Sequence, residues 1–145
     1  RFDTRQSVQD AKHDAETLMK NERIVYFPEG TFTRMPGLLP FHMGAFAAAV
    51  DAGTPIVPVV MRGTRSILRD NSGFPRFGVV HVKVLDAIDN ETYISSDRWG
   101  QSLELRDKVR GVILAHCAEP DLAHEMVHRE LSEKRRQKSR VQDNG

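Results

Sequence analysis

Short apolar runs that alternate with helix-like stretches constrain the fold of this chain most. Ile24–Phe27 and Ile56–Met61 are rich in β-branched and aromatic residues, a composition typical of buried strands. A third run, Val79–Leu85, alternates His81 and Lys83 with valines. Apolar residues at helical spacing predict helices over four further ranges: 7–20, 42–52, 95–118 and 121–140. Because strands alternate with helices, the sequence predicts an α/β domain, a mixed sheet with flanking helices.

Several residues predict where these elements begin and end. Ser7 is a candidate N-cap, with Asp10 completing an imperfect capping box. Gly53 is expected to end the helix predicted over 42–52. Asp97 or Ser96 is expected to cap the N-terminus of the helix predicted over 95–118. Pro58 lies inside the second predicted strand, where it indicates a sheet edge, a bulge or a functional kink.

Composition excludes several classes of protein. The chain has 145 residues, 39% of them apolar and 28% charged, with a net charge of +1. These values suit one folded domain and do not favour disorder, a coiled coil or a dedicated nucleic-acid binder. The single cysteine, Cys117, excludes an internal disulfide and is expected to be a small buried side chain on a helix. No stretch approaches the ~20 apolar residues of a membrane span.

The stretch Pro28-Glu29-Gly30-Thr31 carries the strongest chemical signal. It follows a predicted strand, where open α/β sheets tend to bind ligands, and offers a carboxylate, a flexible backbone and a hydroxyl together. Nearby arginines could hold a phosphate. The alternative is a tight turn capped by Glu29, with solvated arginines. The residues alone leave both interpretations open, although a phosphate-loop NTPase is disfavoured because the Gly-x4-Gly-Lys-Ser/Thr pattern is absent.

Three stretches together resemble the glycerophospholipid acyltransferase family. Phe27-Pro28-Glu29-Gly30-Thr31 is similar to the family's third block, and Val57-Pro58-Val59-Val60 with Arg62-Gly63 to its fourth. Between them lies Pro40-Phe41-His42-Met43-Gly44-Ala45-Phe46 at a fitting distance. Arg1 stands where the arginine of the second block would fall, with Arg5 as the alternative. The resemblance covers about residues 1–90 and implies a glycerolipid acyltransferase-like fold.

Two departures from the family pattern stand out. Phe32 occupies the place of an arginine that usually follows the threonine of the third block, and Arg34 comes two residues later. The first block, His-x4-Asp, would have to precede Arg1, so we expect the catalytic base upstream of these residues and the N-terminal part of the domain to be missing from them. The same spacing recurs in His81…Asp86 and His116…Asp121, which we expect to be chance matches.

The resemblance implies transfer of an acyl chain from acyl-CoA or acyl carrier protein to the hydroxyl of a lysophospholipid such as 1-acyl-glycerol-3-phosphate. General-base catalysis is expected, without a covalent acyl-enzyme, a metal or another cofactor. A non-catalytic lipid- or phosphate-binding role is the alternative. No nucleic acid is expected as a partner. The residues expected to bind substrate are Arg1, Arg5, Glu29, Gly30, Thr31, Arg34 and Pro58.

The end of the chain is basic. We expect residues 1–118 to be the C-terminal portion of an acyltransferase domain, and 119–145 a basic helix and tail. The cations between Arg129 and Arg140 predict either docking on anionic lipid headgroups or an ordinary solvated helix end. Together with the resemblance, they suggest a peripheral protein on the cytoplasmic face of a membrane. His124 and His128 lie four residues apart but have no evident third metal ligand.

Overall fold

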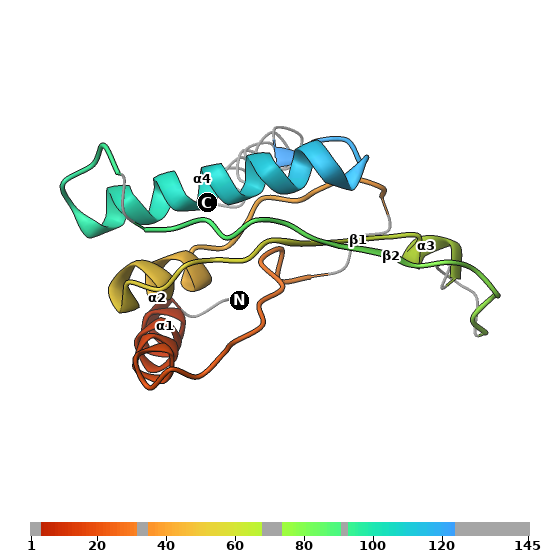
Figure 1. Ribbon diagram of the computed structural model, residues 1–145. Helices are drawn as coiled ribbons and strands as arrows, with labels where there is room; N and C mark the ends of the chain where they lie inside the picture. The colour runs from red at the N-terminus through yellow and green to blue at the C-terminus, as the bar shows by residue number, and fades with distance from the viewer. Residues whose placement is uncertain (1–3, 32–34, 68–73, 91–92, 124–145) are drawn as a thin grey trace, which may run out of the picture.

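The computed structural model describes residues 4–31, 35–67, 74–90 and 93–123. Figure 1 shows a central strand pair with the long helix α4, Arg98–Cys117, along one side. Helices α1, Thr4–Met19, and α2, Gly44–Ala52, lie on the other side in this view. Helix α1 packs on α2, α2 also packs on α4, and α4 packs on the first strand. The described residues thus combine helices with a small sheet, as the α/β class predicts.

The sheet of the described residues has two antiparallel strands, β1, Val59–Arg62, and β2, His81–Val84. In the register, Val60 lies opposite Lys83 and Arg62 opposite His81. Both strands are shorter than the sequence predicts. Ile56 makes only an isolated bridge to Ile88, because Pro58 has no N–H for the ladder between them. The Pro58 carbonyl still accepts from the Leu85 N–H at 3.0 Å, so the expected irregularity at this proline is confirmed.

The predicted buried strand over 24–27 is wrong. These residues form no strand, and Val25 and Phe27 are 81% and 70% exposed. An apolar run becomes a strand only where another strand offers its backbone, and no described segment pairs with this one. The Tyr26 hydroxyl instead donates to the Asp14 carboxylate on α1. Burial, followed by this carboxylate, raises the pKa of Tyr26 above its ordinary value.

The predicted helices form with some shifts at their ends. Helix α1 begins at Thr4, so Ser7 is not its N-cap. Gly53 ends α2 in the left-handed conformation, φ 64°, as predicted. The Asp97 side chain caps α4 by accepting from the Gly100 N–H at 2.7 Å. The segment after β1 contains one short helix, α3, Thr64–Ile67. The helix predicted over 121–140 lies almost wholly outside the described residues.

The core lies between α2, α4 and the chain that approaches α2. Phe46 and Leu105 are its largest fully buried side chains, and Val109 packs beside them. Phe41 stacks on Phe46 with ring centroids 6.2 Å apart. None of the helices within the described ranges has both the length and the apolar character needed to cross a membrane.

Candidate functional site

The Pro-Glu-Gly-Thr stretch forms a tight turn that needs its glycine. The Gly30 N–H donates to the Phe27 carbonyl at 3.0 Å, and Gly30 has a φ of +66°, which L side chains rarely adopt. A Cβ at this position would lie 2.6 Å from Cδ2 of His42. The His42 N–H in turn donates to the Pro28 carbonyl at 2.8 Å. The turn is therefore fixed against the segment that leads into α2.

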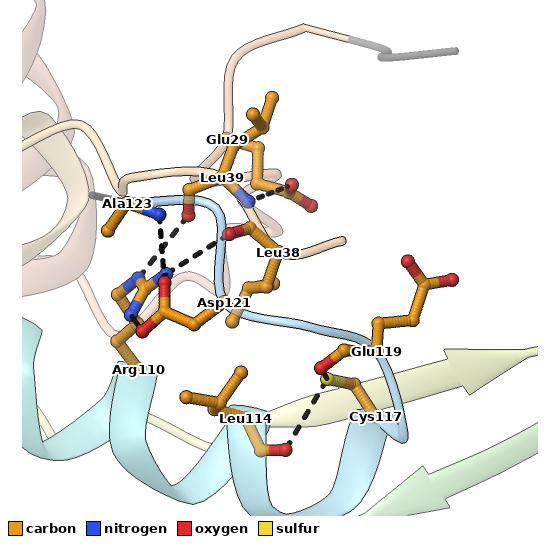
Figure 2. Close-up of polar contacts among 9 residues, drawn as sticks. All are labelled: Glu29, Leu38, Leu39, Arg110, Leu114, Cys117, Glu119, Asp121 and Ala123. Carbon is orange, nitrogen blue, oxygen red and sulfur yellow. Dashed lines mark hydrogen bonds and ion pairs between the residues drawn. The ribbon is translucent and has the colours of Figure 1, made fainter. Parts of the chain in front are cut away.

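Glu29 links this turn to the loop over 35–41. Its Oε2 accepts from the Leu39 N–H at 2.9 Å, a charge-assisted contact across ten residues (Figure 2). Oε1 has no hydrogen-bond partner within the described part of the chain. Glu29 is half-buried, whereas Thr31 is exposed. One carboxylate oxygen thus has a structural role, as the turn-capping interpretation predicts.

Arg110 of α4 holds the other side of the same loop. Its guanidinium donates to the carbonyls of Leu38 and Leu39 at 3.1 and 3.3 Å. It also forms a two-pronged ion pair with Asp121, with distances of 2.5 and 2.9 Å (Figure 2). The side chain is only 13% exposed, and the guanidinium carbon lies 5.8 Å from the centre of the Phe41 ring. The sequence analysis missed Arg110, because nothing in the sequence distinguishes it from the other helical arginines.

A backbone bridge closes the loop against the end of the described chain. Leu38 pairs in parallel with Asp121: the Leu38 N–H donates to Pro120 at 2.8 Å, and the Leu122 N–H donates to Leu38 at 3.0 Å. The Gly37 N–H donates to the Glu119 carboxylate. Glu119 also pairs with Arg65 of α3 at 3.2 Å. We call these contacts, together with the Arg110–Asp121 pair, the C-terminal clasp.

The predicted substrate-binding residues fall into three groups. Glu29, Gly30 and Thr31 come together in the turn. Pro58 is buried at the entrance to β1. Arg1 and Arg34 lie outside the described residues, and Arg5 lies on α1 in a stretch whose side chains are not described. The role of these arginines therefore stays a prediction.

The two His-x4-Asp matches do not form catalytic pairs in the geometry observed. The Asp121 carboxylate accepts from Arg110 and from the Ala123 N–H, and His116 has its Nδ1 2.9 Å from the Val112 carbonyl on its own helix. His81 is exposed on β2, and Asp86 lies beyond the end of that strand. Cys117 is half-buried at the end of α4, with its Sγ near the Leu114 and Glu119 carbonyls. Across the described ranges, no three His, Cys, Asp or Glu residues gather in a way that would hold a metal ion.

Comparison with known proteins agrees with the resemblance found in the sequence. A family model described as Acyltransferase matches residues 1–62, which include the Glu29–Thr31 turn and β1. The chain is 39% identical over 108 residues to a 1-acyl-sn-glycerol-3-phosphate acyltransferase of Escherichia coli, a match that covers 74% of this chain and 41% of that protein. It is 35% identical over 113 residues to the Haemophilus influenzae enzyme of the same name, covering 78% and 39%.

A eukaryotic relative gives a similar match. The 1-acyl-sn-glycerol-3-phosphate acyltransferase of Saccharomyces cerevisiae is 37% identical over 98 residues, which cover 66% of this chain and 31% of the yeast protein. The chain thus spans about two fifths or less of the length of these curated relatives. No solved structure gives a significant match. Taken together, the motifs, the family model and the relatives show that the chain belongs to the glycerophospholipid acyltransferase family.

Proposed function

We propose that the protein carrying this chain transfers an acyl group from acyl-CoA or acyl carrier protein to the hydroxyl of a lysophospholipid such as 1-acyl-glycerol-3-phosphate. The observation that carries this proposal is the Glu29–Thr31 turn. It lies within the residues that the acyltransferase model matches. The Gly30 and His42 N–H groups hold its backbone, and the Leu39 N–H holds the Glu29 carboxylate. A preorganised turn keeps a carboxylate and a hydroxyl in place for a polar acceptor.

The chemistry follows from a base and an acceptor site in separate parts of the protein. A histidine of an upstream His-x4-Asp block removes the proton of the acceptor hydroxyl, and its aspartate orients the imidazole. The alkoxide attacks the thioester carbonyl, and hydrogen-bond donors stabilise the tetrahedral oxyanion until the thiolate leaves. Neither a metal nor another cofactor takes part.

The acceptor phosphate needs positive charge beside the turn. Arg1, Arg5 and Arg34 are the candidates, because two belong to the second-block region and Arg34 follows the position that Phe32 occupies. A guanidinium can bind two phosphate oxygens at once, which favours arginine over lysine here. The protein acts at the cytoplasmic face of a membrane, where its acceptor resides, and the basic residues after 128 support that placement.

Glu29 offers the sharpest test of the site. In the protein that includes the upstream block, Glu29→Gln keeps an amide oxygen to accept from the Leu39 N–H but removes the charge. Since charge-assisted contacts contribute about 1.5–3 kcal/mol, we expect kcat/KM to fall at least about tenfold with little change in thermal stability. Glu22→Gln, an exposed glutamate seven residues earlier, is the matched control and should leave both unchanged. Wild-type kinetics for Glu29→Gln would show that Glu29 serves only the loop.

A non-catalytic role in phosphate or lipid binding is the second candidate, favoured by the structural contact of Glu29 with Leu39. The two candidates differ in what residues 1–145 do alone. Under the enzyme proposal these residues release no thiol from acyl-CoA in the presence of lysophosphatidate, and joining them to the upstream block restores turnover. Turnover by residues 1–145 that disappears in His81→Ala or His116→Ala would place the base here instead and contradict the proposal.

A further inference from the structure

One face of the strand pair bears a cluster of positively charged and titratable side chains. Arg62 of β1 lies opposite His81 of β2, and Lys83, two residues further along β2, lies on the same face. This face is the one that packs towards α4, where His116 completes the group. These four side chains line an open cavity of about 680 Å³, which we call the cationic pocket.

Arg62, His81 and Lys83 of the cationic pocket are all exposed, and in the described part of the chain no carboxylate pairs with them. Four other arginines, Arg65, Arg98, Arg106 and Arg110, each have a carboxylate at 2.5–3.2 Å. Within the described ranges, neither Arg62 nor Lys83 forms such a pair. Because Arg62 and Lys83 lie on the same face and line the same pocket, one anion with several charged oxygens can contact both cations.

The shape of the pocket suits a ligand larger than one phosphate ion. Its volume lies within the range of sites for cofactor-sized molecules, about 300–1,000 Å³. Val79 and Ala115 contribute apolar wall between the charged groups. Gly63 closes one side: its φ is +93°, and a Cβ there would lie 2.3 Å from the Val79 carbonyl oxygen. The backbones can therefore approach closely at this point only because residue 63 is glycine.

The pocket also borders the loop of the candidate acceptor site. Gly63 and Ala118 line the pocket. Arg65 follows Gly63 by two residues and Glu119 follows Ala118 directly, and these two side chains form an ion pair. Glu119 in turn accepts from the Gly37 N–H, two residues before the Leu39 that Glu29 holds. The contacts of Glu119 and Glu29 thus connect the border of the pocket to the Glu29–Thr31 turn through the loop over 35–41.

From these observations we propose that the cationic pocket binds a ligand with two or more phosphate groups through Arg62, Lys83 and His81. The phosphates of CoA have this chemistry. Their choice as the natural source rests on the proposed function, whereas the anion site itself does not.

The pocket lies beside the C-terminal end of α4, and a cation there could simply stabilise the free carbonyls of the helix. The two roles predict opposite effects on the ligand-free protein. If the cations serve the helix end, Lys83→Gln and Arg62→Gln lower the melting temperature. If they serve a ligand, relief of their repulsion leaves the melting temperature unchanged or raises it. A fall in both variants, without loss of ligand binding, overturns the proposal.

Titration calorimetry of residues 1–145 with inorganic phosphate, pyrophosphate and CoA tests the binding directly. We expect pyrophosphate and CoA to bind more tightly than phosphate, and Arg62→Gln and Lys83→Gln each to weaken binding at least about tenfold. Lys108→Gln removes the same charge from an exposed position of α4 outside the pocket, and it should change affinity less than about twofold. Equal losses in Lys83→Gln and Lys108→Gln would mean only general charge attraction and would overturn the proposal.

The ligand series also separates the possible sources of phosphate. If CoA binds at least tenfold more tightly than pyrophosphate, and if Arg62→Gln loses the binding of both, the natural ligand is the acyl donor. Equal affinities identify a simple diphosphate site. Vesicles containing phosphatidate that bind the wild type and Arg62→Gln alike, with no calorimetric signal from soluble phosphates, would overturn the pocket as the anion site. None of these measurements needs turnover, so the acyltransferase proposal can fail while the pocket stands, or the reverse.

Discussion

Two segments of this protein have similar apolar sequences but different environments. Ile24–Phe27 precedes the Glu29 turn and remains exposed, without a strand partner in the described structure. Ile56–Arg62 contains β1, which pairs with β2 and packs on α4, and its Val60 is only 4% exposed. Apolar, β-branched composition is therefore not sufficient for a buried strand, because a strand also needs a partner from elsewhere in the chain.

The comparison predicts that the region around α4 is costly to disturb, whereas residues 24–27 are not. Arg110→Met removes two carbonyl contacts and the pair with Asp121 from a side chain that is 13% exposed. We expect a loss of about 3 kcal/mol in the free energy of unfolding, measured by urea titration. Arg98→Met is the control on the same helix. Its ion pair with Asp51 is exposed, so it should cost less than about 1 kcal/mol. Equal losses would contradict the assignment of Arg110 as the anchor of the loop.

Matched valine substitutions test the two segments themselves. Val60→Ala should cost about 2 kcal/mol, because it removes buried methyl groups, whereas Val25→Ala should cost less than about 0.5 kcal/mol since Val25 is 81% exposed. Urea unfolding of both variants measures the difference. Comparable losses would mean that residues 24–27 are buried in solution and that the comparison fails.

The turn after residues 24–27 is more constrained than those residues. Gly30→Ala should cost about 1–2 kcal/mol, because φ is +66° and the new Cβ meets His42. Gly44→Ala is the control, at the first position of α2, where a Cβ meets nothing within 4 Å; it should be neutral or slightly stabilising. Thermal unfolding measures both, and equal melting temperatures would show that the turn tolerates a side chain.

The smallest expected effect concerns the contact that ties residues 24–27 to α1. Tyr26→Phe removes the hydrogen bond to Asp14 and should cost about 0.5–1 kcal/mol. Because the pKa of Tyr26 in the folded protein is raised above its ordinary value of about 10, this contribution is present below pH 10 and is lost as the pH rises further. Urea titrations at pH 9 and pH 11 should thus differ less in Tyr26→Phe than in the wild type. An identical pH dependence would contradict this contact.

The sequence predicted the local features of the fold better than its long-range pairings. The caps at Gly53 and Asp97 were predictable because each depends on one residue and its immediate neighbours. The absence of a strand over 24–27 and the shortness of β1 were not predictable, since both depend on which other segment pairs with the strand. Residues 1–62 carried enough of the family's motifs to identify the family.

The candidate site was predictable only in part, for a similar reason. Glu29, Gly30 and Thr31 are consecutive, so one motif names them all. Arg110 reaches Leu38 from 72 residues away, and Lys83 and His116 meet only through the packing of α4 on the strands. Residues brought together by tertiary structure leave no spacing in the sequence that would predict them.

The C-terminal clasp has a consequence for the order in which the molecule assembles. Leu38 precedes α2 and Asp121 follows α4, so their pairing closes a loop that contains the whole α2–α4 region. Closing so long a loop is entropically costly until α2 and α4 have already met. The clasp should therefore be among the last contacts to form and the first to open, and amide protons at Leu38 and Leu122 should exchange with solvent well before those of Leu105 and Val109. Transient opening there would release the Leu39 end of the Glu29 contact while the core stays folded.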